Sequence, residues 1–245
     1  MWLRLGSALS LVGAPLWAIQ GRWVRANTPL LPEAGGPRQG QLPFTAAGPA
    51  ERILMVGESP AAGVGARHHR ESLVGCFAAR WGALRERTID WQVVARNGMT
   101  AARTRRELLP DVPRRRTDVI VIVLGVNDTM RLTPVPIWRA QMTGLFDDLR
   151  ERCGPAPIVV SAVPPMQRFP ALPSPLREVL GLRARLLDQH LQEICTGGDN
   201  LVHIGGLIEG ISDEMFCEDR FHPGPEGYEA WGGRLADAAF EMLFG

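Results

Sequence analysis

The sequence predicts a three-layer α/β/α sandwich around a five-stranded parallel sheet. From residue 51 onward, segments with strand and helix patterns alternate along the chain. Such alternation indicates parallel strands joined by right-handed crossovers, with helices on both faces of the sheet. The run 119–124 is apolar at every position, as expected for a central strand buried on both faces. A length of 245 residues suits one such domain with a sizeable core.

The same patterns give approximate bounds for each element. Strands are expected at 52–57, 90–95, 118–124, 156–163 and 200–204. Helices are expected at about 66–84, 100–109, 135–152, 175–196 and 225–243. Polar segments follow the first three strands directly, at the carboxyl ends where open α/β sheets place their ligand sites. We therefore expect those segments to meet at one edge of the sheet.

Two segments precede the predicted domain, which covers residues 51–245. Residues 27–50 are rich in Pro and Gly and have no apolar period, so we interpret them as a linker. Residues 1–26 contain an apolar stretch shorter than the about 20 residues of a full membrane span, and no small-x-small cleavage site follows it. We expect an uncleaved anchor or interfacial helix in a membrane-associated or exported protein of bacterial type. A removed signal, or a helix packed on a cytoplasmic protein, is the alternative.

Charge excludes several classes of protein. The formal net charge is only +1, so nucleic acid is not an expected partner. All 27 basic residues are Arg. The absence of Lys excludes Schiff-base chemistry, a Ser-Lys dyad and a phosphate-binding loop that requires Lys. A general base in this protein is therefore expected to be histidine.

The four cysteines are scattered and lack metal-binding spacing. We expect no metal and no organic cofactor. The cysteines are expected to be reduced core residues, with one or two disulfide bridges left open as an alternative. The sequence does not indicate the oligomeric state.

Three residues provide the parts of an activated nucleophile. Ser59 follows an apolar strand pattern at 53–57 and precedes Pro60, which suits a tight turn that exposes the hydroxyl. Near the C-terminus, Asp219 lies three residues before His222. Histidine can accept the serine proton near neutral pH, and a carboxylate can fix its tautomer and stabilise the imidazolium. The spacing of three allows both residues to come from one loop.

The ordered motifs around these residues resemble the signature blocks of the SGNH hydrolases, also called GDSL-type esterases and lipases, over about residues 51–243. The family's nucleophile, glycine, asparagine and Asp-His pair correspond here to Ser59, Gly98, Asn127, Asp219 and His222. The resemblance implies the flavodoxin-like fold of that family and an oxyanion hole. Its donors would be the backbone N–H groups of Ser59 and Gly98 and the side-chain amide of Asn127. One position departs from the family, because Glu58 replaces the Asp of the usual Gly-Asp-Ser.

The expected activity is hydrolysis of carboxylic esters with short to medium acyl chains, lysophospholipid included, through an acyl-serine. A carbohydrate O-deacetylase or an O-acyltransferase would use the same residues, and a lipid- or protein-binding module on a decayed hydrolase fold is the non-enzymatic alternative. The proline-rich loop after the fourth strand offers Met166, Phe169 and Leu172 as contacts for a small-molecule or lipid substrate, and Met130 offers a second wall. The alternative for the loop is that it caps the core.

Overall fold

The computed structural model describes residues 19–24, 26–44, 48–206 and 212–245, whose strands form one six-stranded sheet in the order β1-β3-β2-β4-β5-β6. The strands are β1 Gln39–Leu42, β2 Glu51–Gly57, β3 Ile89–Ala95, β4 Val119–Val123, β5 Ile158–Ser161 and β6 Leu201–Ile204. Strands β2 to β6 pair in parallel, in the order of flavodoxin-like sheets. The predicted fold class is confirmed. The predicted count of five strands is wrong, because β1 adds an antiparallel edge to β3.

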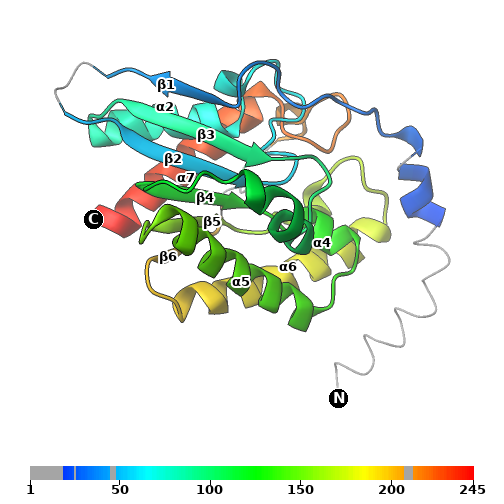
Figure 1. The fold of residues 1–245 in the computed structure, drawn as a ribbon. Helices are drawn as coiled ribbons and strands as arrows, with labels where there is room; N and C mark the ends of the chain where they lie inside the picture. Colours follow the sequence, from blue (N-terminus) through cyan, green and yellow to red (C-terminus); the bar gives the residue numbers. More distant parts are fainter. Residues whose placement is uncertain (1–18, 25, 45–47, 207–211) are drawn as a thin grey trace.

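Helices cover both faces of the sheet (Figure 1). The long helices are α2 Leu73–Arg85, α5 Val135–Cys153, α6 Leu176–Thr196 and α7 Pro225–Phe244. Helices α2 and α7 pack together on one face, and α5 and α6 pack together on the other. Two short helices, α3 Ala101–Arg103 and α4 Val126–Met130, begin just beyond the carboxyl ends of β3 and β4. The three layers therefore follow from the alternation in the sequence.

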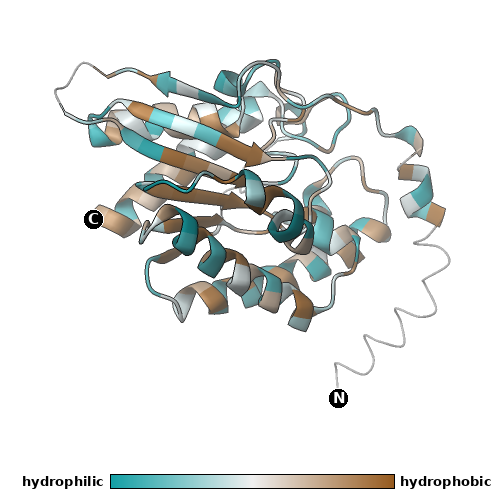
Figure 2. Ribbon diagram, in the orientation of Figure 1, coloured by the Kyte–Doolittle hydropathy of each residue, from teal (hydrophilic) through white to brown (hydrophobic). Residues whose placement is uncertain are grey.

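The central strand β4 divides the core into two parts. All five of its residues are buried, and Figure 2 shows the hydrophobic strands between their helices. Val119, Val121 and Val123 join the core beneath α2 and α7, whereas Ile120 and Ile122 join the core beneath α5 and α6. Each buried side chain of this size contributes about 1.5–3 kcal/mol through removal of apolar surface from water. Apolar residues at consecutive positions are therefore what a strand covered on both faces requires.

The segment predicted as a linker at 27–50 contains ordered structure. Besides β1, its backbone binds the chain after β2: the N–H of Ala34 donates to the carbonyl of Ala62 at 3.1 Å, and the carbonyl of Pro32 accepts from Gly65 at 3.0 Å. We call residues 32–42 the N-terminal strap. The linker prediction is wrong here because the strap is held by backbone pairing, which leaves no apolar period in the sequence.

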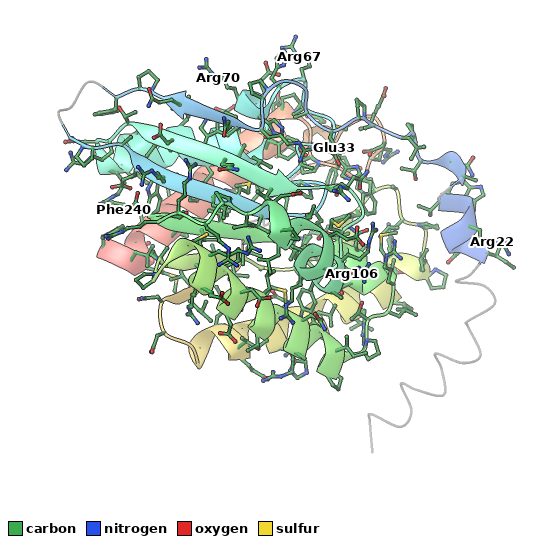
Figure 3. All side chains as sticks on the ribbon, viewed as in Figure 1. Arg22, Glu33, Arg67, Arg70, Arg106 and Phe240 are labelled. Carbon is green, nitrogen blue, oxygen red and sulfur yellow. The ribbon has the colours of Figure 1, made fainter. Side chains whose placement is uncertain are left out.

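The part of the N-terminal segment that the structure describes is a short helix at 19–24. Val24 is buried in the core beneath α5 and α6, and Gln20 donates to the carbonyl of Ser174 at 2.8 Å. Arg22 points away from the domain (Figure 3). Residues 1–18, which include most of the predicted anchor, lie outside the described residues. Among the helices that are described, none has the length and apolar character needed to cross a membrane.

Candidate active site

The turn that carries Ser59, which we call the nucleophile turn after the predicted role of Ser59, follows β2 directly. The end of β2 approaches β4 so closely that a Cβ on Gly57 would lie 2.2 Å from the carbonyl oxygen of Val123. Only glycine allows this approach. The next residue, Glu58, donates its N–H to the same carbonyl at 3.0 Å, and the carbonyl of Ser59 accepts from Val64 at 3.0 Å. Ser59 is thus held in a tight hydrogen-bonded turn at the carboxyl edge of the sheet.

Asp219 and His222 come from one loop that leads into α7. The Oδ2 atom of Asp219 lies 2.5 Å from Nδ1 of His222, and Oδ1 accepts the backbone N–H groups of His222 at 2.9 Å and Phe221 at 3.0 Å. The loop is closed by a hydrogen bond of 2.8 Å from the N–H of Cys217 to the carbonyl of His222. The spacing of three residues therefore brings the carboxylate to the imidazole.

The environment of Asp219 favours the ionised carboxylate. Its side chain is buried, and burial on its own would raise the pKa. Hydrogen bonds from the His222 ring and from the two backbone N–H groups outweigh burial and hold the pKa of Asp219 below its usual value. A charged acceptor at Nδ1 leaves Nε2 as the ring atom with a free lone pair.

Ser59 and His222 line one cavity of about 30 Å³. Its other walls are almost entirely apolar and consist of Pro60, Val126, Pro164, Phe169, Met215, Phe216, Phe221, Pro223 and Trp231. Phe169 packs edge to face on Phe216 and Phe221, with ring centroids 5.7 and 5.0 Å apart. These contacts join the loop after β5 to the loop that carries the Asp-His pair. We call this space the catalytic cavity, after the predicted roles of Ser59 and His222.

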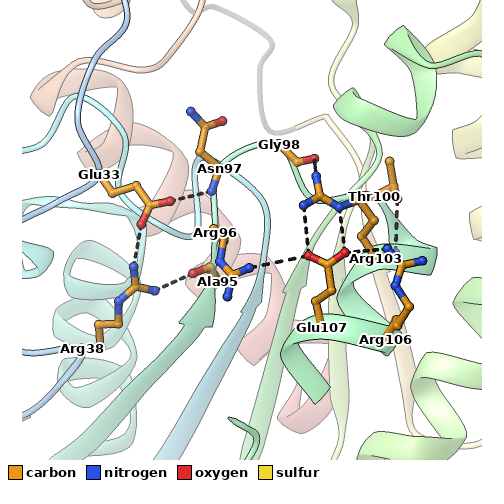
Figure 4. A network of polar contacts seen from close by, with 10 residues as sticks. All are labelled: Glu33, Arg38, Ala95, Arg96, Asn97, Gly98, Thr100, Arg103, Arg106 and Glu107. Atoms are coloured by element: carbon orange, nitrogen blue, oxygen red, sulfur yellow. Dashed lines mark hydrogen bonds and ion pairs between the residues drawn. The ribbon is translucent and has the colours of Figure 1, made fainter. Parts of the chain in front are cut away.

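Gly98 lies between β3 and α3, with a φ of +77° that favours glycine. Charged side chains bind the backbone on both sides of it (Figure 4). Arg103 donates to the carbonyl of Gly98 at 3.1 Å, and Glu33 accepts the N–H of Asn97 at 2.7 Å. Arg38 joins Glu33 to the carbonyl of Ala95, with both contacts at 2.5 Å. Because Glu33 and Arg38 belong to the N-terminal strap, the strap supports this loop as well as the chain after β2.

Asn127 is held by Glu58. The carboxyl group of Glu58 accepts the backbone N–H of Val126 at 2.8 Å, that of Asn127 at 2.9 Å, and a short hydrogen bond from the Asn127 amide. A primary amide has two N–H groups, so the second one remains for another acceptor. Glu58 is buried, and burial raises its pKa to about 7 despite the hydrogen bonds that favour the charged form.

The four residues predicted to bind substrate differ in their positions. Phe169 lines the catalytic cavity. Met166 and Leu172 are instead buried in the core beneath α5 and α6, because the loop turns their side chains inward. This corrects their assignment as cavity contacts and matches the alternative that the loop caps the core. Met130 is exposed at the end of α4 and is not among the residues that line the cavity.

Several wall residues were not predicted from the sequence. Phe216 lies three residues before Asp219 and Phe221 lies between Asp219 and His222, and this proximity in sequence was a usable signal. Trp231 reaches the cavity from α7, and nothing in its local sequence indicates this. All four cysteines are free. Among the described residues, no group of three or more His, Cys, Asp or Glu side chains could hold a metal ion.

Residues 55–230, which make up most of the chain, match the GDSL-like Lipase/Acylhydrolase family. The protein therefore belongs to that family of serine hydrolases. A comparison with curated proteins finds no match.

Solved structures share the fold at low sequence identity. The lipase Lip_vut3 from a goat rumen metagenome has a TM-score of 0.61 at 18% identity, over 78% of this chain and 98% of that one. The psychrotrophic esterase EstA from Pseudoalteromonas sp. has a TM-score of 0.60 at 18% identity, over 80% and 100%. The acetyl xylan esterase Axe2 from Geobacillus stearothermophilus has a TM-score of 0.51 at 17% identity, over 79% and 94%.

Proposed function

We propose that the protein hydrolyses carboxylic esters with short acyl chains through an acyl-Ser59 intermediate. The observation that carries the proposal is the Asp219–His222 pair, which shares a cavity with Ser59 at the carboxyl edge of the sheet. A serine after a strand is common as a turn or capping residue. A serine that lines the same cavity as a carboxylate-bound imidazole has the parts required for nucleophilic attack.

The proposed reaction has two halves. Nε2 of His222 accepts the proton of Ser59 as the Ser59 Oγ forms a bond to the carbonyl carbon. The imidazolium returns that proton to the alkoxide as the ester C–O bond breaks, and the alcohol leaves. Water then attacks the acyl carbon and gives a proton to His222. The imidazolium passes this proton to Ser59 Oγ as the bond between the acyl carbon and Oγ breaks, and the carboxylic acid departs. Asp219 stabilises the imidazolium in both halves, and its lowered pKa keeps it charged for this role.

The tetrahedral intermediates carry a negative oxygen that needs donors. We propose the backbone N–H groups of Ser59 and Gly98 and the second amide N–H of Asn127. One such donor contributes about 10²–10³ in turnover in other serine hydrolases. The hydrogen bonds from Val126 and Asn127 to Glu58 support this role, because they fix the helix start that carries the amide.

The small catalytic cavity favours a short acyl group. Its volume of about 30 Å³ is small for a ligand pocket, which usually measures about 300–1,000 Å³. An acetyl or propionyl group is therefore a better match than a long fatty acyl chain. A carbohydrate O-deacetylase is the second candidate, supported by the same small cavity and by the structural likeness to the acetyl xylan esterase.

Hydrolysis of 4-nitrophenyl esters from acetate to decanoate would test the proposal. The wild type should cleave the acetate and propionate esters with the highest kcat/KM, and Ser59→Ala should be inactive on all of them while keeping the wild-type circular dichroism spectrum. A folded Ser59→Ala variant with wild-type turnover would exclude Ser59 as the nucleophile. A rise in kcat/KM toward decanoate would contradict the short-acyl preference.

A further inference from the structure

A second cavity, of about 320 Å³, adjoins the catalytic cavity and shares Pro164 and Trp231 with it. We call it the outer cavity. Its remaining walls come from the end of β5, the loop after β5, helix α6 and the start of the chain that follows β6. They are Ser161, Ala162, Val163, Pro165, Gln167, Arg168, Gly181, Arg185, Asp188 and Gly206. A volume of this size accommodates a small organic molecule, whereas the catalytic cavity does not.

The two cavities differ in charge as well as in size. The catalytic cavity has His222 as its one titratable wall residue, among apolar walls. The outer cavity has two guanidinium groups, those of Arg168 and Arg185, and one carboxylate, that of Asp188. Asp188 is already engaged, because its Oδ1 accepts the N–H of Val163 at 2.8 Å and lies 2.9 Å from Nε2 of His203. With two guanidinium groups and one carboxylate, the described walls have a formal charge of +1, which favours an anionic ligand.

Trp231 gives a second indication that this space holds a ligand. Its side chain is 3% exposed, and its indole Nε1 has no hydrogen-bond partner among the described residues. An unpaired buried donor costs about 1–3 kcal/mol. Because Trp231 lines both cavities, we take its indole N–H to be the donor that an acceptor atom on a bound molecule would satisfy. Nearby, Oε1 of Gln167 is likewise buried without a partner in the described part of the chain.

We propose that the outer cavity binds the alcohol portion of the ester and that this alcohol carries an anionic group, a phosphate or a carboxylate. The inference rests on the proposed function, since it assigns the two cavities to the two halves of one ester. The acyl group lies in the catalytic cavity, and the alcohol extends past Pro164 and Trp231. Arg185 binds its oxyanion beside the positive charge of Arg168, and the indole N–H of Trp231 donates to an oxygen near the ester.

The test compares acetyl esters of similar size. 2-Acetoxyethyl phosphate and acetoxyacetate carry the two candidate anions, and butyl acetate is the neutral control. The wild type should have a kcat/KM at least about tenfold higher for one of the anionic esters, the effect of one charge-assisted hydrogen bond. Whichever anion is preferred identifies the group. A wild type that cleaves butyl acetate as well as both anionic esters would overturn the proposal.

Variants then assign the preference to residues. Arg185→Gln and Trp231→Phe should each lower the ratio of anionic to neutral kcat/KM by about tenfold or more. Arg177→Gln is the matched control, because Arg177 is also exposed on α6, pairs with Glu178 at 3.0 Å and does not line the outer cavity. The control should keep the wild-type ratio. An equal fall in Arg177→Gln would show a general charge effect and overturn the assignment.

Calorimetric binding of 2-hydroxyethyl phosphate and of glycolate separates the two proposals, because it requires no turnover. The wild type should bind one of them, and Arg185→Gln should weaken the Kd by about tenfold. If neither binds, or if Arg185→Gln binds equally well, the outer cavity is not an anion site. If one binds but no ester is cleaved, the proposed function fails and the binding site stands.

Discussion

The two proposed oxyanion donors outside the nucleophile turn are held in place by different kinds of electrostatic contact. Asn127 is fixed by a single buried carboxyl group, that of Glu58, which accepts three hydrogen bonds. The loop of Gly98 is fixed by several partly exposed ion pairs that involve Glu33, Arg103 and Glu107. One side chain therefore holds Asn127, whereas several side chains share the support of the Gly98 loop.

The two arrangements differ in their sensitivity to pH, substitution and salt. A buried carboxyl group has no water to replace a lost partner, and its charge state depends on pH. In the exposed network, Glu107 keeps its charge because hydrogen bonds from Arg103 and Arg106 lower its pKa to about 2. Exposed ion pairs are worth about 0–1 kcal/mol each and are screened by salt. The hydrogen bonds of Glu58 should therefore be sensitive to pH and to substitution, whereas the ion pairs around Gly98 should be sensitive mainly to salt.

The largest effect in this comparison should come from Asn127 itself. Asn127→Ala should lower kcat for 4-nitrophenyl acetate by about 10² or more, with little change in KM. The reason is that the hydrogen bond from the Asn127 side-chain amide to the substrate carbonyl oxygen strengthens as negative charge develops on that oxygen. Steady-state kinetics with urea unfolding as a folding control would measure this. A change confined to KM would instead indicate that Asn127 binds the substrate in its ground state.

Glu58→Gln should reduce kcat less than Asp219→Asn, since Asp219 must stabilise an imidazolium and Glu58 holds neutral donors. Parallel kinetics of the two variants would measure this. Equal losses would place Glu58 in direct contact with the reaction.

Glu58 also predicts a dependence of stability on pH. Its pKa rises from 4.5 to about 7 on folding, so between these values the folded state binds more protons than the unfolded state. The wild type should therefore lose stability as pH rises through this window, by roughly 3 kcal/mol. Glu58→Gln, which does not titrate, should lack this loss. Urea unfolding at pH 5 and pH 8 gives the free energy of unfolding of both proteins. If the difference in this free energy between wild type and Glu58→Gln is the same at both pH values, the raised pKa is contradicted.

Glu33→Gln should have a smaller effect on turnover. The amide oxygen can still accept the N–H of Asn97, and the change removes only the charge that pairs with Arg38. We expect a loss of no more than about fivefold in kcat, and high salt should bring the wild type toward the variant. Glu178→Gln is a matched control at an exposed ion pair on α6. A loss of 10² or more in Glu33→Gln would show that the strap controls the oxyanion hole as strongly as Glu58.

The smallest effect on chemistry should come from deletion of residues 1–18. These residues make up most of segment 1–26, which we propose as a membrane anchor, and every proposed catalytic residue lies beyond residue 50. The truncated protein should cleave soluble acetate esters within about twofold of the wild type and should shift from the membrane to the soluble fraction. A fall in melting temperature with unchanged fractionation would indicate instead that the segment packs on the domain.

Much of the architecture could be predicted because it is encoded locally. The apolar run at 119–124 and the alternating patterns around it indicate strand β4 and the layers beside it. The contact between Asp219 and His222 depends on residues three positions apart in one loop. Features of this kind leave a signal in a short stretch of sequence.

What the sequence did not reveal depends on contacts between distant segments. Glu58 binds backbone N–H groups 68 and 69 residues away, and backbone donors have no signature of residue type. The strand β1 pairs through its backbone, and Gly40 lies against the ring of Trp91, so it has no apolar alternation. In the loop after β5, composition could not determine that Phe169 faces the cavity while Met166 faces the core.

The central claim is that Ser59 is the nucleophile, and covalent labelling tests it most directly. A fluorophosphonate probe forms a stable bond only with a serine that a neighbouring base activates. After peptide digestion, mass spectrometry should find the probe on Ser59 in the wild type and no label in Ser59→Ala, while a control variant at the exposed Ser174, Ser174→Ala, should be labelled as in the wild type. Modification of another residue with Ser59 unmodified would contradict the account.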